Sequence, residues 1–215
     1  MPTPWLLLTG FEPFGGDDVN PSWELARHLD GQMLAGWPVR ARCLPCRFAA
    51  APQALQAALD ERPAAVVCLG LAGSRSALSV ERVAVNLVDA RIADNGGEQP
   101  GDQAIVPGGP AAYFSRLPVK SMVHAALQVG VPAELSLSAG SFVCNQVFYA
   151  LLHALRRRPR VAAGFVHVPW APGMGASSDA AASLPLDDQL RGLRAMLACV
   201  LAGGADRQDI GGSLC

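Results

Sequence analysis

The sequence places a cysteine, a histidine and a glutamate where their side chains could act together. Cys144 stands in the first turn of a helix that is predicted to begin at Ser141, whose hydroxyl can cap it. The unpaired N–H groups and the positive dipole end of such a turn stabilise a thiolate, the form of cysteine that attacks carbonyl carbons. Cys144 also continues an apolar stripe with Phe148 and Leu152, so a small core residue is the alternative interpretation.

The candidate base is His167. It lies near the carboxyl end of the apolar segment 161–170, shortly before Pro169. Ligands of open α/β sheets gather outside the carboxyl ends of the strands. The other three histidines of the chain fall in helical patterns that offer no such position. A purely structural histidine is the alternative.

The candidate acid is Glu81, in a strand predicted over 79–90. Val83, Val85 and Leu87 occupy the same alternating positions, so a carboxylate shares its strand face with apolar side chains. A buried carboxylate needs a partner, and a Cys/His/acid triad supplies one, because the acid orients the imidazole that serves the thiol. The alternative puts Glu81 at the strand start, where its side chain reaches water.

Strand and helix patterns alternate along the chain, which predicts one α/β domain over residues 1–215. Apolar runs bounded by turn residues predict strands at 5–10, 38–45, 64–70, 79–90, 133–138 and 161–170. Helical patterns predict a helix that Asn20 caps and Pro21 begins, and others at 49–60, 118–129, from 141 onward and at 185–202. Strands separated by helices imply a parallel or mixed sheet that is covered on both faces.

Two segments lie outside these elements. The Gly- and Pro-rich segment 91–112 predicts a long loop, and loops of that length are usually functional or mobile. The segment 203–215 is expected to be a flexible tail.

Composition bounds the class of protein. Hydrophobic residues make up 51% of the chain and charged residues 16%, so a globular protein that self-associates is expected. The net charge is -1, and the basic run 156–160 resembles a solvated turn rather than a nucleic-acid site. No run approaches the roughly 18 apolar residues of a membrane span, and the N-terminus lacks the basic region of a signal peptide. We therefore expect a cytoplasmic protein with no nucleic-acid or membrane partner and with six reduced cysteines.

Three further motifs carry weaker signals. CLPC (43–46) has C-x-x-C spacing, but it lacks a second pair or a nearby histidine, and its cysteines would face opposite sides of a strand. The glycine-rich turn GLAGSR (70–75) does not match a nucleotide-binding motif. GFEPFGG (10–16) holds Phe11 and Phe14 in a loop at a strand end, which suggests an apolar pocket, with plain loop packing as the alternative.

Four segments together resemble the pyroglutamyl peptidase I (pyrrolidone-carboxylate peptidase) family of cysteine peptidases. They are LLTGFEPFGG with VNPSWE, ERVAVNLVDARIADN, AGSFVCNQVFYALLH and GFVHVPW, and they extend from Leu6 to Trp170. The resemblance implies a single-domain α/β/α sandwich with a mostly parallel, mixed and twisted sheet. It also implies a cytosolic homodimer or homotetramer, without metal or cofactor, that acts on peptides with N-terminal pyroglutamate and releases 5-oxoproline.

The same resemblance assigns roles to residues. It implies that Cys144 is the nucleophile, His167 the base and Glu81 the orienting acid, with Arg91 near the oxyanion. Asn20 would brace the phenylalanine loop. The lactam pocket would be lined by Phe11, Phe14, Leu71, Phe142 and Val143.

The chain departs from the family pattern in two regions. Leu71 and Ser74 stand where the family usually has Gln and Gly, which concerns the pocket, and 171–179 replaces an acidic segment after the histidine strand. Two other functions stay open at this point. One is a nucleoside-processing enzyme on a similar α/β scaffold, and the other is a non-catalytic relative that only binds pyroglutamyl peptides.

Overall fold

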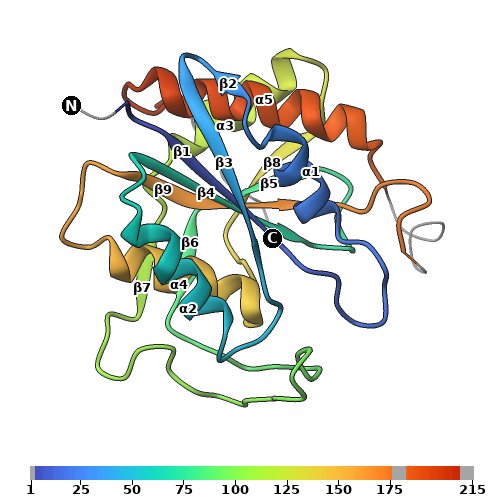
Figure 1. The fold of residues 1–215 in the computed structure, drawn as a ribbon, viewed down its shortest axis with the longest axis vertical. Coiled ribbons are helices and arrows are strands. Elements are labelled where there is room, and N and C mark those ends of the chain that lie inside the picture. Colours follow the sequence, from blue (N-terminus) through green and yellow to red (C-terminus); the bar gives the residue numbers. More distant parts are fainter. Residues whose placement is uncertain (1–2, 176–182, 209–215) are drawn as a thin grey trace.

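A twisted sheet of seven strands runs through the centre of the molecule (Figure 1). The computed structural model describes residues 3–175 and 183–208. The strand order is β2-β3-β1-β4-β9-β5-β8. These strands are β1 (Leu6–Phe11), β2 (Met33–Leu34), β3 (Trp37–Leu44), β4 (Ala65–Leu71), β5 (Leu78–Glu81), β8 (Ala133–Ser136) and β9 (Ala162–Val168). A second, two-stranded sheet joins β6 (Val83–Val85) to β7 (Ala112–Phe114).

The central sheet is mixed and mostly parallel, which confirms the prediction. β3, β1, β4 and β9 run parallel to one another. β5 lies antiparallel to β9 and pairs with β8 in parallel on its other side. As a result the carboxyl ends of β1, β4 and β9 meet at one edge of the sheet, the edge where ligands gather in open α/β sheets.

Helices cover both faces of the sheet, as an α/β/α sandwich requires (Figure 1). α1 (Pro21–Leu29), α3 (Val119–Gln128) and α5 (Leu186–Ala202) pack on one face, and α2 (Ala51–Asp60) and α4 (Val143–Ala154) on the other. Alternate strand residues divide between the two cores: in β4, Val66 and Cys68 face α2 and α4, whereas Val67 and Leu69 face the other helices. This division explains why β4 is apolar without interruption.

The predicted start of α1 is confirmed. Asn20 caps the helix, its Oδ1 accepting the N–H of Ser22 at 3.0 Å, and Pro21 takes the first position. The Ser22 hydroxyl in turn accepts the N–H of Phe11 at 3.0 Å. Gly10 lies under this turn, where a Cβ would be 2.5 Å from the Ser22 carbonyl carbon. β1 and α1 therefore meet backbone to backbone at the strand end that carries Phe11.

The predicted strand 79–90 is wrong beyond Glu81. β5 ends there, and β6 leaves the central sheet to pair with β7. Asn145 of α4 holds the diverted segment, since its side chain bonds the N–H and C=O of Val85 at 3.0 and 2.9 Å and the C=O of Leu87 at 2.9 Å. Glu81 therefore does not share one continuous strand face with the apolar residues that follow it.

The predicted cap of α4 is also wrong. Phe142, in an extended conformation, is the N-cap residue, and the first turn has no side-chain cap. The Ser141 hydroxyl instead donates to the carbonyl of Asp89 at 2.6 Å, and the N–H of Asp89 donates to the carbonyl of Ser141 at 3.0 Å. Ser141 therefore ties the start of α4 to the segment that follows β6.

The long loop 91–112 is pinned to the body of the protein. Asp94 accepts the N–H of Phe48 at 2.6 Å and that of Gly96 at 2.7 Å. The Asn95 side chain donates to Glu12 Oε1 at 2.9 Å and to the carbonyl of Pro13 at 2.8 Å. These bonds hold the long loop against the segment that carries Phe11 and Phe14.

Part of the segment predicted to be a flexible tail is anchored. Asp206 accepts the N–H groups of Lys120 and Ser121 at the start of α3, at 3.2 and 2.9 Å. Residues 209–215 of that segment lie outside the described residues, as do residues 176–182 of the segment that departs from the family pattern.

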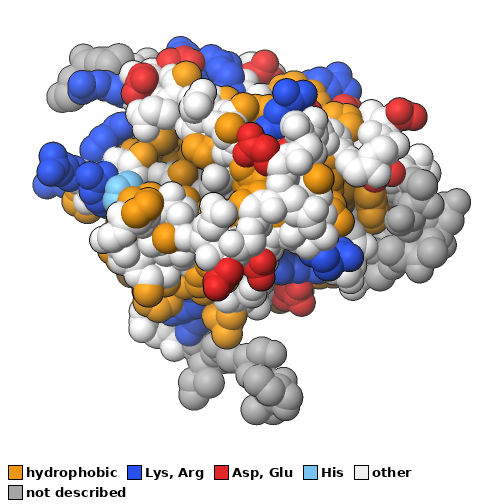
Figure 2. All heavy atoms as spheres, turned by 90° about the horizontal axis from the view of Figure 1, so that it is seen from below, with side chains coloured by type: hydrophobic (Ala, Val, Ile, Leu, Met, Phe, Trp, Pro, Cys, Tyr) orange, Lys and Arg blue, Asp and Glu red, His pale blue; other side chains and the backbone are white. Residues whose placement is uncertain are grey.

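Charged side chains are spread over the surface with one basic concentration. The turn 156–160 between α4 and β9 exposes Arg156, Arg157 and Arg160. The view from the side of α2 and α4 shows Lys and Arg gathered at one end and both signs of charge elsewhere (Figure 2). Among the helices of the described ranges, none combines the length and the apolar character that a membrane span requires.

The contact of Gly10 with α1 generates a stability prediction. We expect Gly10→Ala to lower the free energy of unfolding by at least about 1–3 kcal/mol, because the new methyl group would meet backbone atoms that cannot move aside. Gly101→Ala is the matched control, since a Cβ there would be 3.8 Å from its nearest neighbour, Asp89 Oδ1. Urea unfolding measures both variants, and equal destabilisation would contradict the contact.

Candidate active site

A histidine and a carboxylate from neighbouring strands form the buried part of the site. His167 of β9 pairs with Ser79 of β5, and Glu81 pairs with Phe165, so Glu81 and His167 are diagonal neighbours on one face of the sheet. His167 Nδ1 lies 2.8 Å from Glu81 Oε1. Glu81 is fully buried, which rules out the alternative that its side chain reaches water at a strand start.

The thiol reaches the same face from above the sheet. Cys144 is the second residue of α4 and is partly exposed. Gly70 of β4 pairs with His167, and a Cβ on Gly70 would lie 2.8 Å from Cys144 Sγ and 2.7 Å from the Phe165 ring. The missing side chain at Gly70 therefore leaves the space in which Sγ sits, next to the strand position of His167.

Cys144 and His167 open onto a pocket of about 230 Å³ at the carboxyl edge of β1, β4 and β9. Seven of the residues predicted for the site line it: Phe11, Phe14, Asn20, Leu71, Phe142, Cys144 and His167. The lining also includes residues that the sequence did not single out as site residues: Cys46, Ala72, Ser74, Arg75, Ala139 and Gly140. The fold thus brings together segments from most of the chain.

Three predicted site residues lie elsewhere among the described residues. Glu81 is behind His167 and does not face the pocket. Val143 is fully buried in the core under α4. Arg91 is exposed on the long loop and is not among the residues that line the pocket.

Aromatic rings form one side of the pocket, and hydrogen bonds hold them. Phe14 and Phe142 have ring centroids 6.3 Å apart, and Phe48 packs edge-on against Phe142 at 5.1 Å. The Asn20 side chain, besides capping α1, donates to the carbonyl of Glu12 at 3.0 Å. Asn20 therefore joins the Phe11–Phe14 loop to α1. Phe11 itself is buried rather than exposed.

The environment keeps Glu81 ionised. Burial alone would raise the pKa of Glu81, but the hydrogen bond from His167, the Ser136 hydroxyl and the charge of Arg75 together hold it below its usual value. An ionised carboxylate only accepts hydrogen bonds, so Nδ1 of His167 must carry a proton. The other ring nitrogen, Nε2, is then free to accept one while the imidazole is neutral.

Burial favours that neutral imidazole and a neutral thiol. Burial lowers the pKa of His167, against the opposing effect of Glu81. Burial also raises the pKa of the Cys144 thiol above its usual range. The first turn of a helix stabilises a nearby anion by only about 0.3–2 kcal/mol, less than a thiolate loses in an apolar site. Burial therefore favours the neutral form of each partner, whereas the position of Cys144 in a first turn favours a thiolate.

Comparison with known proteins identifies the relatives of this chain. The sequence model of the family described as pyroglutamyl peptidase matches residues 5–202. The chain belongs to the pyroglutamyl peptidase family. A pyrrolidone-carboxylate peptidase of Cupriavidus taiwanensis is 51% identical, and the match covers 100% of both chains. A relative from Klebsiella pneumoniae with the same name is 48% identical over 97% of this chain and 98% of its own.

The fold of the family is shared as well. The crystal structure of pyroglutamyl peptidase I from Bacillus amyloliquefaciens superposes with a TM-score of 0.91 at 39% identity, covering 95% of this chain and 100% of the other. This agreement supports the α/β/α arrangement for the present family member.

Arg75 is the charged pocket residue that the sequence analysis missed. It ends the glycine-rich turn GLAGSR after β4, at the sheet edge where ligands gather. This position after a strand end could have marked Arg75 as a site residue in the sequence. Within the described ranges, no group of three or more His, Cys, Asp or Glu side chains is arranged to hold a metal ion.

Proposed function

We propose that this family member is a cysteine exopeptidase that hydrolyses the bond after an N-terminal pyroglutamyl residue and releases 5-oxoproline. One observation carries the proposal: the buried Glu81–His167 hydrogen bond lies behind a pocket that Cys144 and aromatic side chains line. The family to which the chain belongs supports the substrate class.

The pocket suits an uncharged, flat ring. A pyroglutamyl group has no charged amine, so its recognition needs apolar walls and a few hydrogen bonds. Phe11, Phe14 and Phe142 supply apolar surface, and Asn20 and Ser74 are neutral polar side chains of the lining. The volume, about 230 Å³, is below the roughly 300–1,000 Å³ of pockets for drug-sized ligands, as a single residue requires.

The chemistry follows from the protonation states. His167 Nε2 accepts the thiol proton of Cys144 while the sulfur attacks the carbonyl carbon between pyroglutamate and the next residue. The charge of Glu81 stabilises the resulting imidazolium, which then protonates the leaving amine. Water hydrolyses the thioester, releases 5-oxoproline and restores the thiol. The backbone N–H of Cys144, in an uncapped first turn, can stabilise the oxyanion, a contribution of about 3 kcal/mol per donor.

The predicted roles of Val143 and Arg91 belong to this proposal. Val143 is the first residue of α4 and can contribute to the pocket through its backbone. Arg91 comes shortly after Asp89, and Asp89 is hydrogen-bonded to Ser141, which directly precedes α4. The backbone that leads to Arg91 therefore passes close to the start of α4. A guanidinium there would favour negative charge on the tetrahedral intermediate.

The predicted cytoplasmic location and the homodimer or homotetramer are also part of the proposal. Phe114 and Leu137 expose 71% and 58% of their surface, and an assembly would cover such apolar side chains.

Release of a chromogenic amine from its pyroglutamyl amide tests the function. We expect turnover with the pyroglutamyl amide and none with the prolyl amide, whose ring has a charged amine and a methylene group in place of the lactam N–H and carbonyl. Binding without turnover would favour the non-catalytic alternative. Neither binding nor turnover, with hydrolysis of a nucleoside instead, would favour the nucleoside-processing alternative.

A first prediction concerns the nucleophile. Cys144→Ser should keep the fold, since it changes one atom of a partly exposed side chain, and should abolish amide hydrolysis. In the wild type, iodoacetamide should modify Cys144 faster than Cys68, which is fully buried in β4. Peptide mass spectrometry measures both rates. Cys68→Ser is the control variant and should stay active, and activity retained in Cys144→Ser would end the thiol-peptidase proposal.

A second prediction concerns pH. Protonation of His167 removes the base, so kcat/KM should fall at low pH, with its acid limb below the ordinary imidazole pKa of about 6.5 because burial lowers the pKa of His167. Glu81 raises that pKa, so Glu81→Gln should move the limb to still lower pH and reduce kcat.

His167→Ala gives the reference for that series. It should lose about 10²–10⁴-fold in kcat, more than Glu81→Gln, because it removes the proton acceptor itself. A Glu81→Gln variant with the wild-type kcat and the wild-type pH profile would make Glu81 a structural acid.

A third prediction concerns Leu71, where the family usually has Gln. The side chain lines the pocket and can give the lactam only apolar contact. Leu71→Gln should lower KM several-fold and leave kcat unchanged, because one neutral hydrogen bond contributes about 1 kcal/mol to ground-state binding. Leu127→Gln, at an exposed leucine of α3 outside the pocket lining, is the control. A large drop in kcat would show instead that Leu71 packs the pocket.

A further inference from the structure

Arg75 holds two parts of the site at once. Its Nη1 donates to Glu81 Oε1 at 2.7 Å, the same oxygen that lies 2.8 Å from His167 Nδ1. Its Nη2 donates to the carbonyl of Ser138 at 2.9 Å, in the segment that leads from β8 to α4. One planar guanidinium therefore connects the buried acid to the segment that precedes Cys144.

The turn that carries Arg75 is itself fixed. The N–H of Arg75 donates to the carbonyl of Ala72 at 3.0 Å, and the N–H of Ala72 donates to the carbonyl of Val168 in β9 at 2.9 Å. A Cβ on Gly73 would be 2.5 Å from Trp170 Nε1, so the turn packs directly on the residues after β9. The backbone of Arg75 is thus attached, through this turn, to the strand that supplies His167.

The pairing also balances charge. Glu81 is fully buried, and the Arg75 side chain is 22% exposed. With His167 neutral, Arg75 is the cation that compensates the buried carboxylate, and an uncompensated buried charge would be strongly destabilising. Without that cation Glu81 would take up a proton more readily and could then present a donor to His167, which would disturb the ring tautomer that the reaction needs.

We propose that Arg75 is a positioning residue of the active site, whose two-armed bridge keeps Glu81 charged and aligned with His167 and sets the start of α4. The proposal rests on the proposed function only for its kinetic readouts. Arg75 need not touch the substrate for this role, even though it lines the pocket.

The charged and titratable groups around the pair come from several elements. Glu81 of β5 and Arg75 both influence the pKa of His167. The pKa of Cys144 in α4 is influenced by Glu81 and Arg75, and also by Cys46, which follows β3, and by Cys68 of β4. The charge of Arg75 lowers the pKa of His167, of Glu81 and of Cys144. Removing that charge should therefore shift all three titrations to higher pH.

Arg75→Gln is the decisive variant. We expect kcat to fall about 10–100-fold, by analogy with the loss seen when a residue that orients a metal-binding side chain is removed, with KM changed less than threefold. The acid limb of kcat/KM should move to higher pH, opposite to the shift expected for Glu81→Gln. A merely structural role would lower stability without moving the limb.

Arg75→Lys separates charge from geometry. A lysine keeps the positive charge but cannot make two divergent hydrogen bonds from one planar group. We expect it to return the acid limb to its wild-type position and to leave kcat reduced. A wild-type kcat in Arg75→Lys would overturn the two-armed bridge, and this variant decides the question if Arg75→Gln fails to fold by near-UV circular dichroism.

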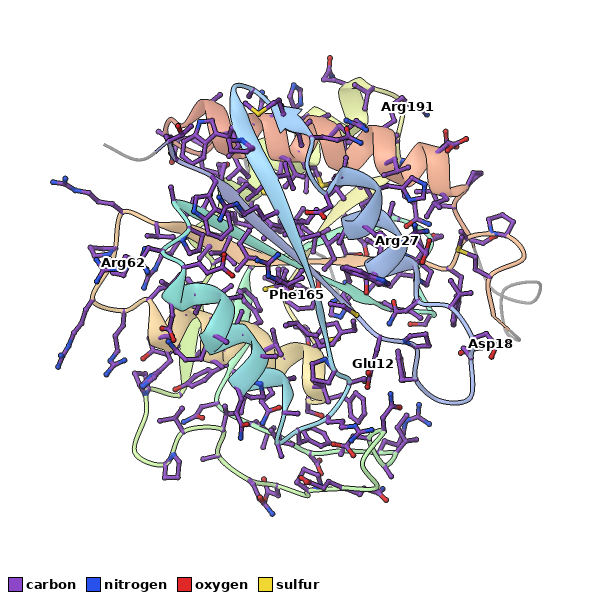
Figure 3. The ribbon with its side chains drawn as sticks, in the orientation of Figure 1. Glu12, Asp18, Arg27, Arg62, Phe165 and Arg191 are labelled. Carbon is purple, nitrogen blue, oxygen red and sulfur yellow. The ribbon has the colours of Figure 1, made fainter. Side chains whose placement is uncertain are left out.

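Arg191→Gln is the matched control. Arg191 also pairs with a carboxylate, Asp188 at 2.7 Å, and with a backbone carbonyl, that of Val129 at 3.1 Å. It lies on α5 at the outer side of the molecule, whereas Phe165, which contacts His167, lies at the centre (Figure 3). We expect kcat and the pH profile of Arg191→Gln to match the wild type.

The rate of Cys144 alkylation by iodoacetamide gives a readout that does not need the proposed substrate. Its pH curve should move to higher pH in Arg75→Gln and stay in place in Arg191→Gln. A wild type that cleaves no pyroglutamyl amide would overturn the proposed function, yet this curve would still test Arg75. An unmoved curve together with a wild-type kcat, or a rise in KM alone, would overturn the positioning role.

Discussion

The site depends on one buried negative charge. Glu81 is fully enclosed, and a carboxylate without partners in such a place would be strongly destabilising. Its oxygen Oε1 meets His167 and Arg75, which come from β9 and from the turn after β4. These three elements are adjacent in the order β4-β9-β5, so the pairing of the central strands and the ionisation of Glu81 stabilise each other. A change in any of the three residues therefore alters the hydrogen bonding or the ionisation of the other two.

The direction of β5 decides how deep the acid lies. Because β5 runs antiparallel to β9, its last residue, Glu81, pairs with Phe165 rather than with the residues at the sheet edge. The carboxylate therefore lies farther from the sheet edge than His167, behind the imidazole and out of the pocket. In a parallel arrangement the end of β5 would lie at the open edge with the ends of β4 and β9, where water would compete for the carboxylate.

Burial shapes the chemistry that this arrangement can perform. It favours the neutral thiol and the neutral imidazole, so in the proposed reaction the proton moves as the sulfur attacks. In the proposed reaction the uncapped first turn of α4 and the charge of Glu81 would favour the ions that form, the oxyanion and the imidazolium. Gly70 allows this meeting, because any side chain there would occupy the place of Cys144 Sγ. A tight pocket and a reactive pair thus come from the same packing.

The sequence by itself determined the features that local patterns encode. Apolar runs marked β1, β4 and β9, and the Asn20–Pro21 signal marked α1, because strand alternation and helix capping are set by neighbours in the chain. The placement of Cys144 in a first turn was local in the same way. Only the tertiary structure decided that the strand of Glu81 ends there, that Ser141 bonds Asp89 instead of capping α4, and that Arg75 meets Glu81. Each of these depends on partners brought together by the strand order, such as Asn145 of α4 binding the backbone of Val85 across 60 positions of sequence, and no local propensity contains that information.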